Sequence, residues 1–168
     1  MTSAYLRGYP ADTVHQVETL RQSGKLASWL LQKYPQGHGL RDDRALFGYV
    51  QELKQDYLKG AQMVSKVQYD NKLQLVQNAL GTHTNIARVQ GSQLKAKREI
   101  RIASLFKDTP LEFLRMICVH ELAHLKERDH DRNFYKLCCY MEPGYHQLEF
   151  EVRVYLSYLD SADTPLWS

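Results

Sequence analysis

One segment of this sequence restricts the fold more than any other. From Leu111 to about Lys126, apolar residues lie on nearly every side of a predicted helix. A helix that is apolar all round is buried in the interior of a protein. Thr109 and Pro110 precede the segment, and Glu112 follows Thr109 by three residues, which is typical of a helix start capped by Thr109. We therefore expect this helix to lie in the core.

Three ionisable residues interrupt this apolar helix in the pattern H-E-x-x-H: His120, Glu121 and His124. Residues four apart project from the same helix face, about 6 Å apart along the axis, so both imidazoles can reach one ion. Glu121 lies about 100° further round and can border that ion without binding it. The pattern is typical of a zinc metalloprotease. The structural alternative is a pair of hydrogen-bonded core histidines with Glu121 in a salt bridge. Because burying three such groups is costly without a compensating ion, the metal site is favoured.

A catalytic zinc ion usually has three protein ligands and one water molecule, so a third ligand is needed. His130 is the first candidate, because the spacing H-E-x-x-H-x-x-x-x-x-H matches that of the metzincin proteases. Glu127 stands where those proteases have a glycine, so the chain must turn back towards the ion in another way. A carboxylate near the C-terminus, Glu149 or Glu151, is the alternative third ligand.

The run from His120 to Tyr135, followed by Pro143-Gly-Tyr145, resembles the YgjP-like metallopeptidase family of small bacterial hydrolases. The pattern of that family is H-E-L-x-H-L, a histidine six residues further on, and then an aromatic pair. The resemblance covers about residues 109 to 146 and is less clear over residues 1 to about 60. It implies a zincin-like α+β fold. It also implies the site residues, with His120, His124 and His130 as metal ligands and Glu121 as the catalytic base.

The remainder of the chain predicts helices, then a small sheet, then helices again. Residues 11 to about 60 carry apolar residues at helical spacing, and residues 62 to 104 alternate as β-strands do. Further helices are expected at about 131 to 140 and 146 to 159. This order is typical of an α+β fold. We expect one zincin-like domain over residues 1–168, with a helical extension at 1–60 and the sheet and active-site helices at 61–168. The sheet is expected to be mostly antiparallel and packed against the active-site helix.

The last predicted strand ends near Ser104 and is expected at a sheet edge beside the active-site helix, where an extended peptide can pair with it. Its polar face carries Lys95, Lys97 and Arg101, which can attract an anion, although a simply solvated face is the plainer interpretation. Arg98 interrupts the apolar face of the strand and needs a partner or a route to solvent.

Composition restricts the partners and the cellular compartment that we expect for this chain. The net charge of +3 permits contact with phosphates but is weaker than that of dedicated nucleic-acid domains. The three cysteines, Cys118, Cys138 and Cys139, form no disulfide pattern, which favours a reducing compartment. The first residues do not resemble a signal peptide, and no apolar run is long enough to span a bilayer. We therefore expect a cytoplasmic protein and exclude a membrane-embedded protease.

The sequence predicts an enzyme that hydrolyses its substrate with a water molecule activated by one zinc or other divalent ion. A metallopeptidase acting on a peptide or protein ranks first. A nucleotide pyrophosphatase ranks second, because relatives have been described as either and phosphate hydrolysis needs cations near the metal. A DNA-associated SprT-like protease and a non-catalytic metal-binding module are further alternatives. Tyr135 or Tyr145 is a candidate donor to an oxyanion. The oligomeric state is not predicted.

Overall fold

The computed structural model describes residues 4–73, 85–89, 96–162 and 164–168, of which 85–89, 96 and 97 are described by their backbone alone. The elements follow one another in the predicted order of helices, strands and helices. They are the 3₁₀ turn η1 (Ala4–Leu6), helices α1 (Ala11–Gln22), α2 (Leu26–Lys33) and α3 (Asp43–Tyr57), strands β1 (Val64–Asp70), β2 (Asn85–Val89) and β3 (Ala96–Ala103), the 3₁₀ turn η2 (Ser104–Asp108), and helices α4 (Leu111–Ala123), α5 (Arg132–Met141) and α6 (Tyr145–Ala162). None of the helices in these ranges is long and apolar enough to cross a bilayer.

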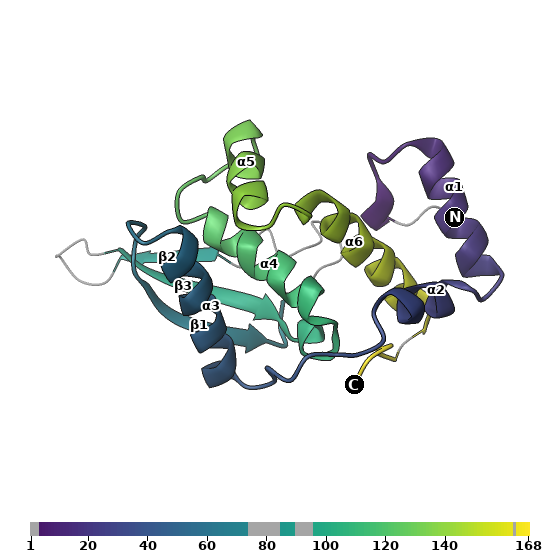
Figure 1. Cartoon of the computed structure of the whole chain (residues 1–168), viewed down its shortest axis with the longest axis horizontal. Helices are drawn as coiled ribbons and strands as arrows, with labels where there is room; N and C mark the ends of the chain where they lie inside the picture. The colour runs from purple at the N-terminus through teal and green to yellow at the C-terminus, as the bar shows by residue number, and fades with distance from the viewer. Residues whose placement is uncertain (1–3, 74–84, 90–95, 163) are drawn as a thin grey trace.

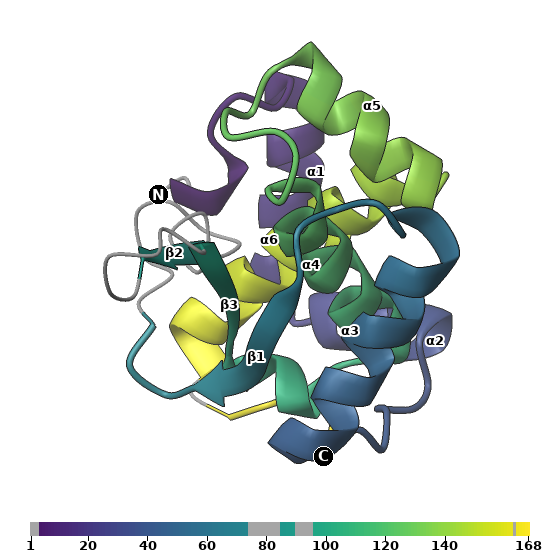
Figure 2. The same ribbon diagram turned by 90° about the vertical axis from the view of Figure 1, so that its left-hand side faces the viewer.

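Helix α4 lies in the middle of the molecule, as its apolar surface predicts. It contacts α3, α5, α6 and β3 (Figures 1 and 2). Every residue from Met116 to Leu125 is buried, which is more than two full turns of consecutive residues. The helix therefore has no solvent-facing side over the stretch that carries His120, Glu121 and His124.

The predicted cap at the start of α4 is wrong. The Thr109 hydroxyl donates to the carbonyl of Phe106 at 3.0 Å, so it serves the preceding turn η2. Pro110 occupies the cap position and has no side chain that could accept a hydrogen bond. The helix starts without a capping box because packing of its buried residues, rather than a local cap, holds it in place.

The sheet is mixed, and the expectation of a mostly antiparallel sheet is wrong. Its strand order is β1-β3-β2. Strand β1 runs parallel to β3, with Val67 opposite Ile100 and Tyr69 opposite Ile102, whereas β2 runs antiparallel to β3. A period-two alternation shows that one face of a strand is buried, but it does not show in which direction the neighbouring strand runs.

Strand β3 is the central strand, so its expected place at an edge of the sheet is also wrong. Its backbone pairs with β1 on one side and with β2 on the other. Ile100 and Ile102 are fully buried on the face towards α4. The strand thus supports the active-site helix but does not offer a free backbone edge to a peptide over residues 98–100, which pair on both sides.

The N-terminal helices contact the sheet, helix α4 and helix α6. Helix α3 packs on β1, whereas α2 contacts α6, at the far side of α4 from the sheet (Figure 1). Buried Glu151 on α6 accepts hydrogen bonds from Lys33 and from the Tyr34 hydroxyl at the end of α2. These contacts connect α2 to α6. The division of the chain into an extension at 1–60 and a domain at 61–168 stays a prediction.

Candidate metal centre

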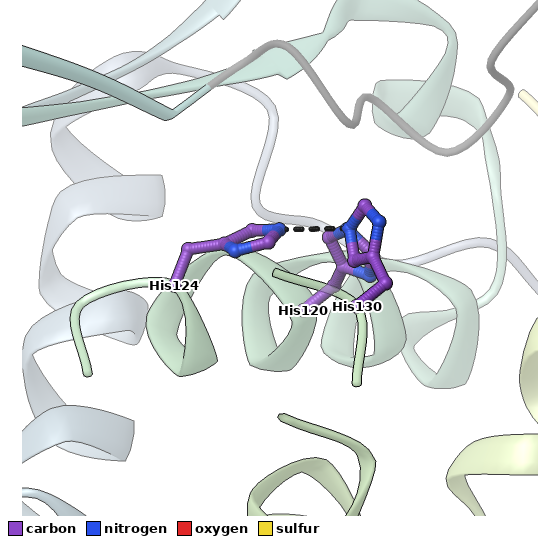
Figure 3. A group of neighbouring side chains, drawn as sticks. All are labelled: His120, His124 and His130. Carbon is purple, nitrogen blue, oxygen red and sulfur yellow. Dashed lines mark hydrogen bonds between the residues drawn. The ribbon is translucent and has the colours of Figure 1, made fainter. Parts of the chain in front are cut away.

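Three histidines meet at the C-terminal end of α4. His120 lies in the last turns of the helix, His124 is its C-cap residue, and His130 precedes α5. Their ligand atoms lie within 4.8 Å of one another, and the Nε2 atoms of His124 and His130 are 3.0 Å apart (Figure 3). His120 and His124 are buried, whereas His130 is exposed. The cluster therefore has two imidazoles anchored in the core and one at the solvent boundary.

The chain returns from α4 to the cluster without the glycine that metzincins use. After His124, the backbone amides of Leu125 and Lys126 bond to carbonyls three residues back, which tightens the last turn. The carbonyl of Glu127 then receives the Nδ1 hydrogen of His124 at 2.9 Å. At the other end of the loop, the Asp131 carboxylate caps α5 by accepting from the Phe134 amide at 3.0 Å. Two ordinary helix-end structures thus bring His130 back beside His124.

The buried histidines are held in their neutral form. Burial lowers the pKa of His120 well below its ordinary value, and the neighbouring imidazoles of His124 and His130 lower it further. Burial also lowers the pKa of His124, against the opposing effect of its backbone hydrogen bonds. A neutral imidazole is the form that binds a metal ion.

The cluster fits a metal ion on its own geometry. His120 Nε2 is buried and has no hydrogen-bond partner among the described residues. Because the Glu127 carbonyl can only accept, His124 carries its hydrogen on Nδ1 and presents a lone pair at Nε2. Neutral imidazole nitrogens are suitable ligands for zinc and other first-row transition metals.

Glu121 lies beside the cluster but does not belong to the group of converging ligand atoms. It is fully buried, and its Oε2 is 3.9 Å from His120 Nε2. That separation is too long for a hydrogen bond between these two atoms. A carboxylate in this place would lie beside an ion bound by His120 without having to coordinate it.

Phe134 forms the floor of the cluster. This fully buried ring lies 4.9 Å from His120, 4.5 Å from His124 and 4.9 Å from His130, measured between ring centres. Its position on the first turn of α5 explains why the aromatic pair after His130 belongs with the histidine motif. A large apolar ring here also restricts the rotation of all three imidazoles.

The two alternative carboxylate ligands lie elsewhere. Glu149 accepts a hydrogen bond from the Tyr145 hydroxyl at 3.0 Å, and Glu151 binds Lys33 and Tyr34. Neither belongs to the group of ligand atoms found in the described part of the chain. His130 is therefore the third side chain that the structure brings to His120 and His124.

Tyr145 does not take the expected role of an oxyanion donor. It is fully buried, and its hydroxyl lies between His120 Nδ1 at 2.8 Å and Glu149 at 3.0 Å. Burial, together with the Glu149 charge, raises the pKa of Tyr145 well above its ordinary value. The sequence carries one signal of this arrangement: Tyr145 and Glu149 are four residues apart and so share a helix face.

The strand residue whose charge acts on the cluster is not one of the three cations predicted on the polar face of the strand. Lys95 and the side chain of Lys97 lie outside the described residues, and Arg101 pairs with Asp70 at 3.4 Å. Arg98 instead shares the buried, α4-facing side of β3, and its charge lowers the pKa of His124. Its Nε donates to Gln62 at 2.9 Å, which is the partner that its place on the apolar face required.

Helix α6 carries a second arginine whose charge acts on the cluster. The charge of Arg153 lowers the pKa of His120, and one of its terminal nitrogens donates to the carbonyl of Tyr5 at 3.1 Å. Its Nε is buried and has no hydrogen-bond partner among the described residues. Positive charge thus reaches the histidines from both β3 and α6.

The chain is similar to a known protein family and to a named bacterial protein. The family described as YgjP-like, metallopeptidase domain, matches residues 68–153, a range that contains the three histidines, Glu121 and Tyr145. The chain is also 52% identical over 155 residues to a protein of Escherichia coli (strain K12) named UTP pyrophosphatase, which covers 92% of this chain and 93% of that protein. No solved structure matches the chain, so the zincin-like fold stays a prediction.

Proposed function

The chain belongs to the YgjP-like metallopeptidase-domain family, and on this basis we propose that it hydrolyses a nucleoside triphosphate to a nucleoside monophosphate and pyrophosphate. One observation carries the proposal: a relative that is 52% identical over nearly the whole of both chains is named UTP pyrophosphatase. The family and the relative both point to a hydrolase. The choice of a nucleotide substrate is the finer step that the proposal adds.

We propose that His120, His124 and His130 hold a zinc ion, a metal that commonly binds three histidines in catalytic sites. When bound, the ion would supply a water molecule of lowered pKa and a positive charge that makes the phosphorus more electrophilic. Glu121 accepts the proton of the attacking water, and the oxygen of that water bonds to the α-phosphorus. At the same time the bond breaks between the α-phosphorus and the oxygen that bridges it to the β-phosphorus. Glu121 then passes the proton to the departing pyrophosphate.

A nucleotide substrate is favoured over a peptide, which the sequence alone ranked first. The peptide hypothesis used a free strand edge beside the active-site helix, but β3 pairs on both sides. A peptide cannot add to β3 over residues 98–100, where both edges are already bonded. A nucleotide needs no such edge, because its recognition depends on groups that bind phosphate.

We propose that Arg98 and Arg153 contact the phosphate chain of the substrate. Both lie near enough for their charges to act on a histidine of the cluster, Arg98 on His124 and Arg153 on His120. Arginine is well suited to phosphate, because its planar fork of donors can bond two oxygens at once. Cations next to the metal stabilise the charge that develops during phosphate hydrolysis, and these two arginines are the candidates for that role.

The test offers the zinc-loaded protein UTP, the other nucleoside triphosphates and unfolded casein in parallel. We expect pyrophosphate and nucleoside monophosphate to be released, casein to stay intact, and the activity to disappear after chelation and return with zinc. Cleavage of casein without release of pyrophosphate would show that the chain is a peptidase. Activity on neither substrate class, with zinc bound, would also overturn the proposal.

A further inference from the structure

A buried chain of hydrogen bonds leads away from His120 on the side opposite to its Nε2 atom. His120 Nδ1 lies 2.8 Å from the Tyr145 hydroxyl, which donates to Glu149 Oε2 at 3.0 Å. Tyr145 is 0% exposed, His120 2% and Glu149 9%, so little water competes for these bonds. The Cys138 thiol is a further neighbour of the same hydroxyl.

The chemistry of these groups fixes where the hydrogens lie. A carboxylate only accepts, so the single hydroxyl hydrogen of Tyr145 points to Glu149. The hydroxyl oxygen then has only lone pairs for the imidazole, and His120 must carry its hydrogen on Nδ1. This leaves the lone pair of His120 on Nε2, the nitrogen free to bind an ion.

We propose that Tyr145 and Glu149 are positioning residues of the metal site, which hold His120 in its metal-binding tautomer and in one ring orientation. The inference rests on the metal-binding part of the proposed function and is independent of the substrate. Groups that accept the second nitrogen hydrogen of a metal-bound histidine usually change metal affinity by about 10- to 100-fold. Because the carboxylate of Glu149 acts through the tyrosine, we expect a value of about tenfold, at the lower end of that range.

The chain contains a matched control for the loss of such a hydroxyl. Tyr34 is also buried and also donates its hydroxyl to a buried glutamate of α6, in this case Glu151. The ring of Tyr34 packs on Phe113 rather than on a histidine. Tyr34→Phe and Tyr145→Phe therefore each remove one hydrogen bond to a buried glutamate of α6, but only Tyr145→Phe affects His120.

The experiment measures the zinc dissociation constant of the whole chain by competition with a chromogenic chelator. It also records the visible absorption spectrum of the cobalt-substituted protein. We expect Tyr145→Phe to bind zinc about tenfold more weakly and to change the cobalt spectrum, whereas Tyr34→Phe keeps the wild-type values. Glu149→Gln keeps an oxygen that can accept from Tyr145 but loses the charge, so we expect a smaller weakening, in the same direction.

The outcomes separate this inference from the proposed function. If the wild type binds zinc and Tyr145→Phe binds it equally tightly with the same cobalt spectrum, the positioning role is refuted while the proposed function stands. An equal loss of affinity in Tyr34→Phe would also refute the role, because it would be a general effect of destabilisation. If Tyr145→Phe does not fold, Glu149→Gln decides, and unchanged affinity in that variant overturns the inference.

Discussion

Replacement of Glu121 by glutamine tests the chemistry of the site with the least structural change. Glutamine has the shape of glutamate, so Glu121→Gln opens no cavity in the fully buried position. The carboxylate is 3.9 Å from His120 Nε2 and is not a member of the ligand group, so the variant is expected to keep its zinc ion. A neutral amide also costs less to bury than a carboxylate, so the free energy of unfolding is not expected to fall.

The expected loss is confined to turnover. A general base contributes about 10²- to 10⁴-fold to a rate, which corresponds to about 3–5 kcal/mol of transition-state stabilisation. The assay compares kcat for UTP, zinc content and thermal unfolding of Glu121→Gln with those of the wild type. Glu112→Gln is the control, because Glu112 is an exposed carboxylate on the first turn of the same helix. Wild-type kcat in Glu121→Gln would refute the assignment of the base, and loss of zinc from this variant would show that Glu121 is a ligand.

Three further predictions follow from the surroundings of the cluster. Phe134→Ala removes a fully buried ring and is expected to lower the free energy of unfolding by about 3–5 kcal/mol in urea denaturation. A loss below about 1 kcal/mol would contradict the packing of the Phe134 ring on the imidazoles. Arg98→Gln removes a hydrogen bond to a charged phosphate, commonly about 1.5–3 kcal/mol, so KM for UTP is expected to rise about 10- to 100-fold. The control Arg101→Gln, on the opposite face of β3, is expected to leave KM unchanged, and equal effects of the two substitutions would contradict the role of Arg98. The metal-free protein is expected to lose stability as pH falls below about 6.5, because the fold lowers the pKa values of His120 and His124, so both take up protons more readily in the unfolded chain. Chemical denaturation at several pH values measures this, and a free energy of unfolding that rises on acidification through this range would contradict it.

The centre of the fold and the histidine cluster could be predicted from local sequence because both depend on helical spacing. An uninterrupted apolar surface places α4 in the core, and a separation of four residues places His120 and His124 on one face. The short loop to His130 limits how far that residue can lie from the helix end. Glu127 in place of a glycine was not an obstacle, because its carbonyl bonds His124.

Features that depend on long-range pairing could not be predicted in the same way. The alternation of β3 indicates which residues share a face, but not that β1 runs parallel to it or that β2 occupies its other edge. For the same reason, the alternation predicts Arg101 on the polar face as an anion-binding residue, whereas the charges that lower histidine pKa values come from Arg98 on the buried face and from Arg153 on α6. The sequence places Glu149 near the site but does not show that Tyr145 lies between it and His120.

X-ray absorption spectroscopy of the zinc-loaded protein, with the metal content measured on the same sample, tests the central claim most directly. The account predicts one zinc ion per chain, bound by three imidazole nitrogens and one further light atom, with one imidazole fewer in His130→Ala. A sample that takes up no zinc, or a spectrum with sulfur ligands or with the same imidazole count after loss of His130, would contradict it.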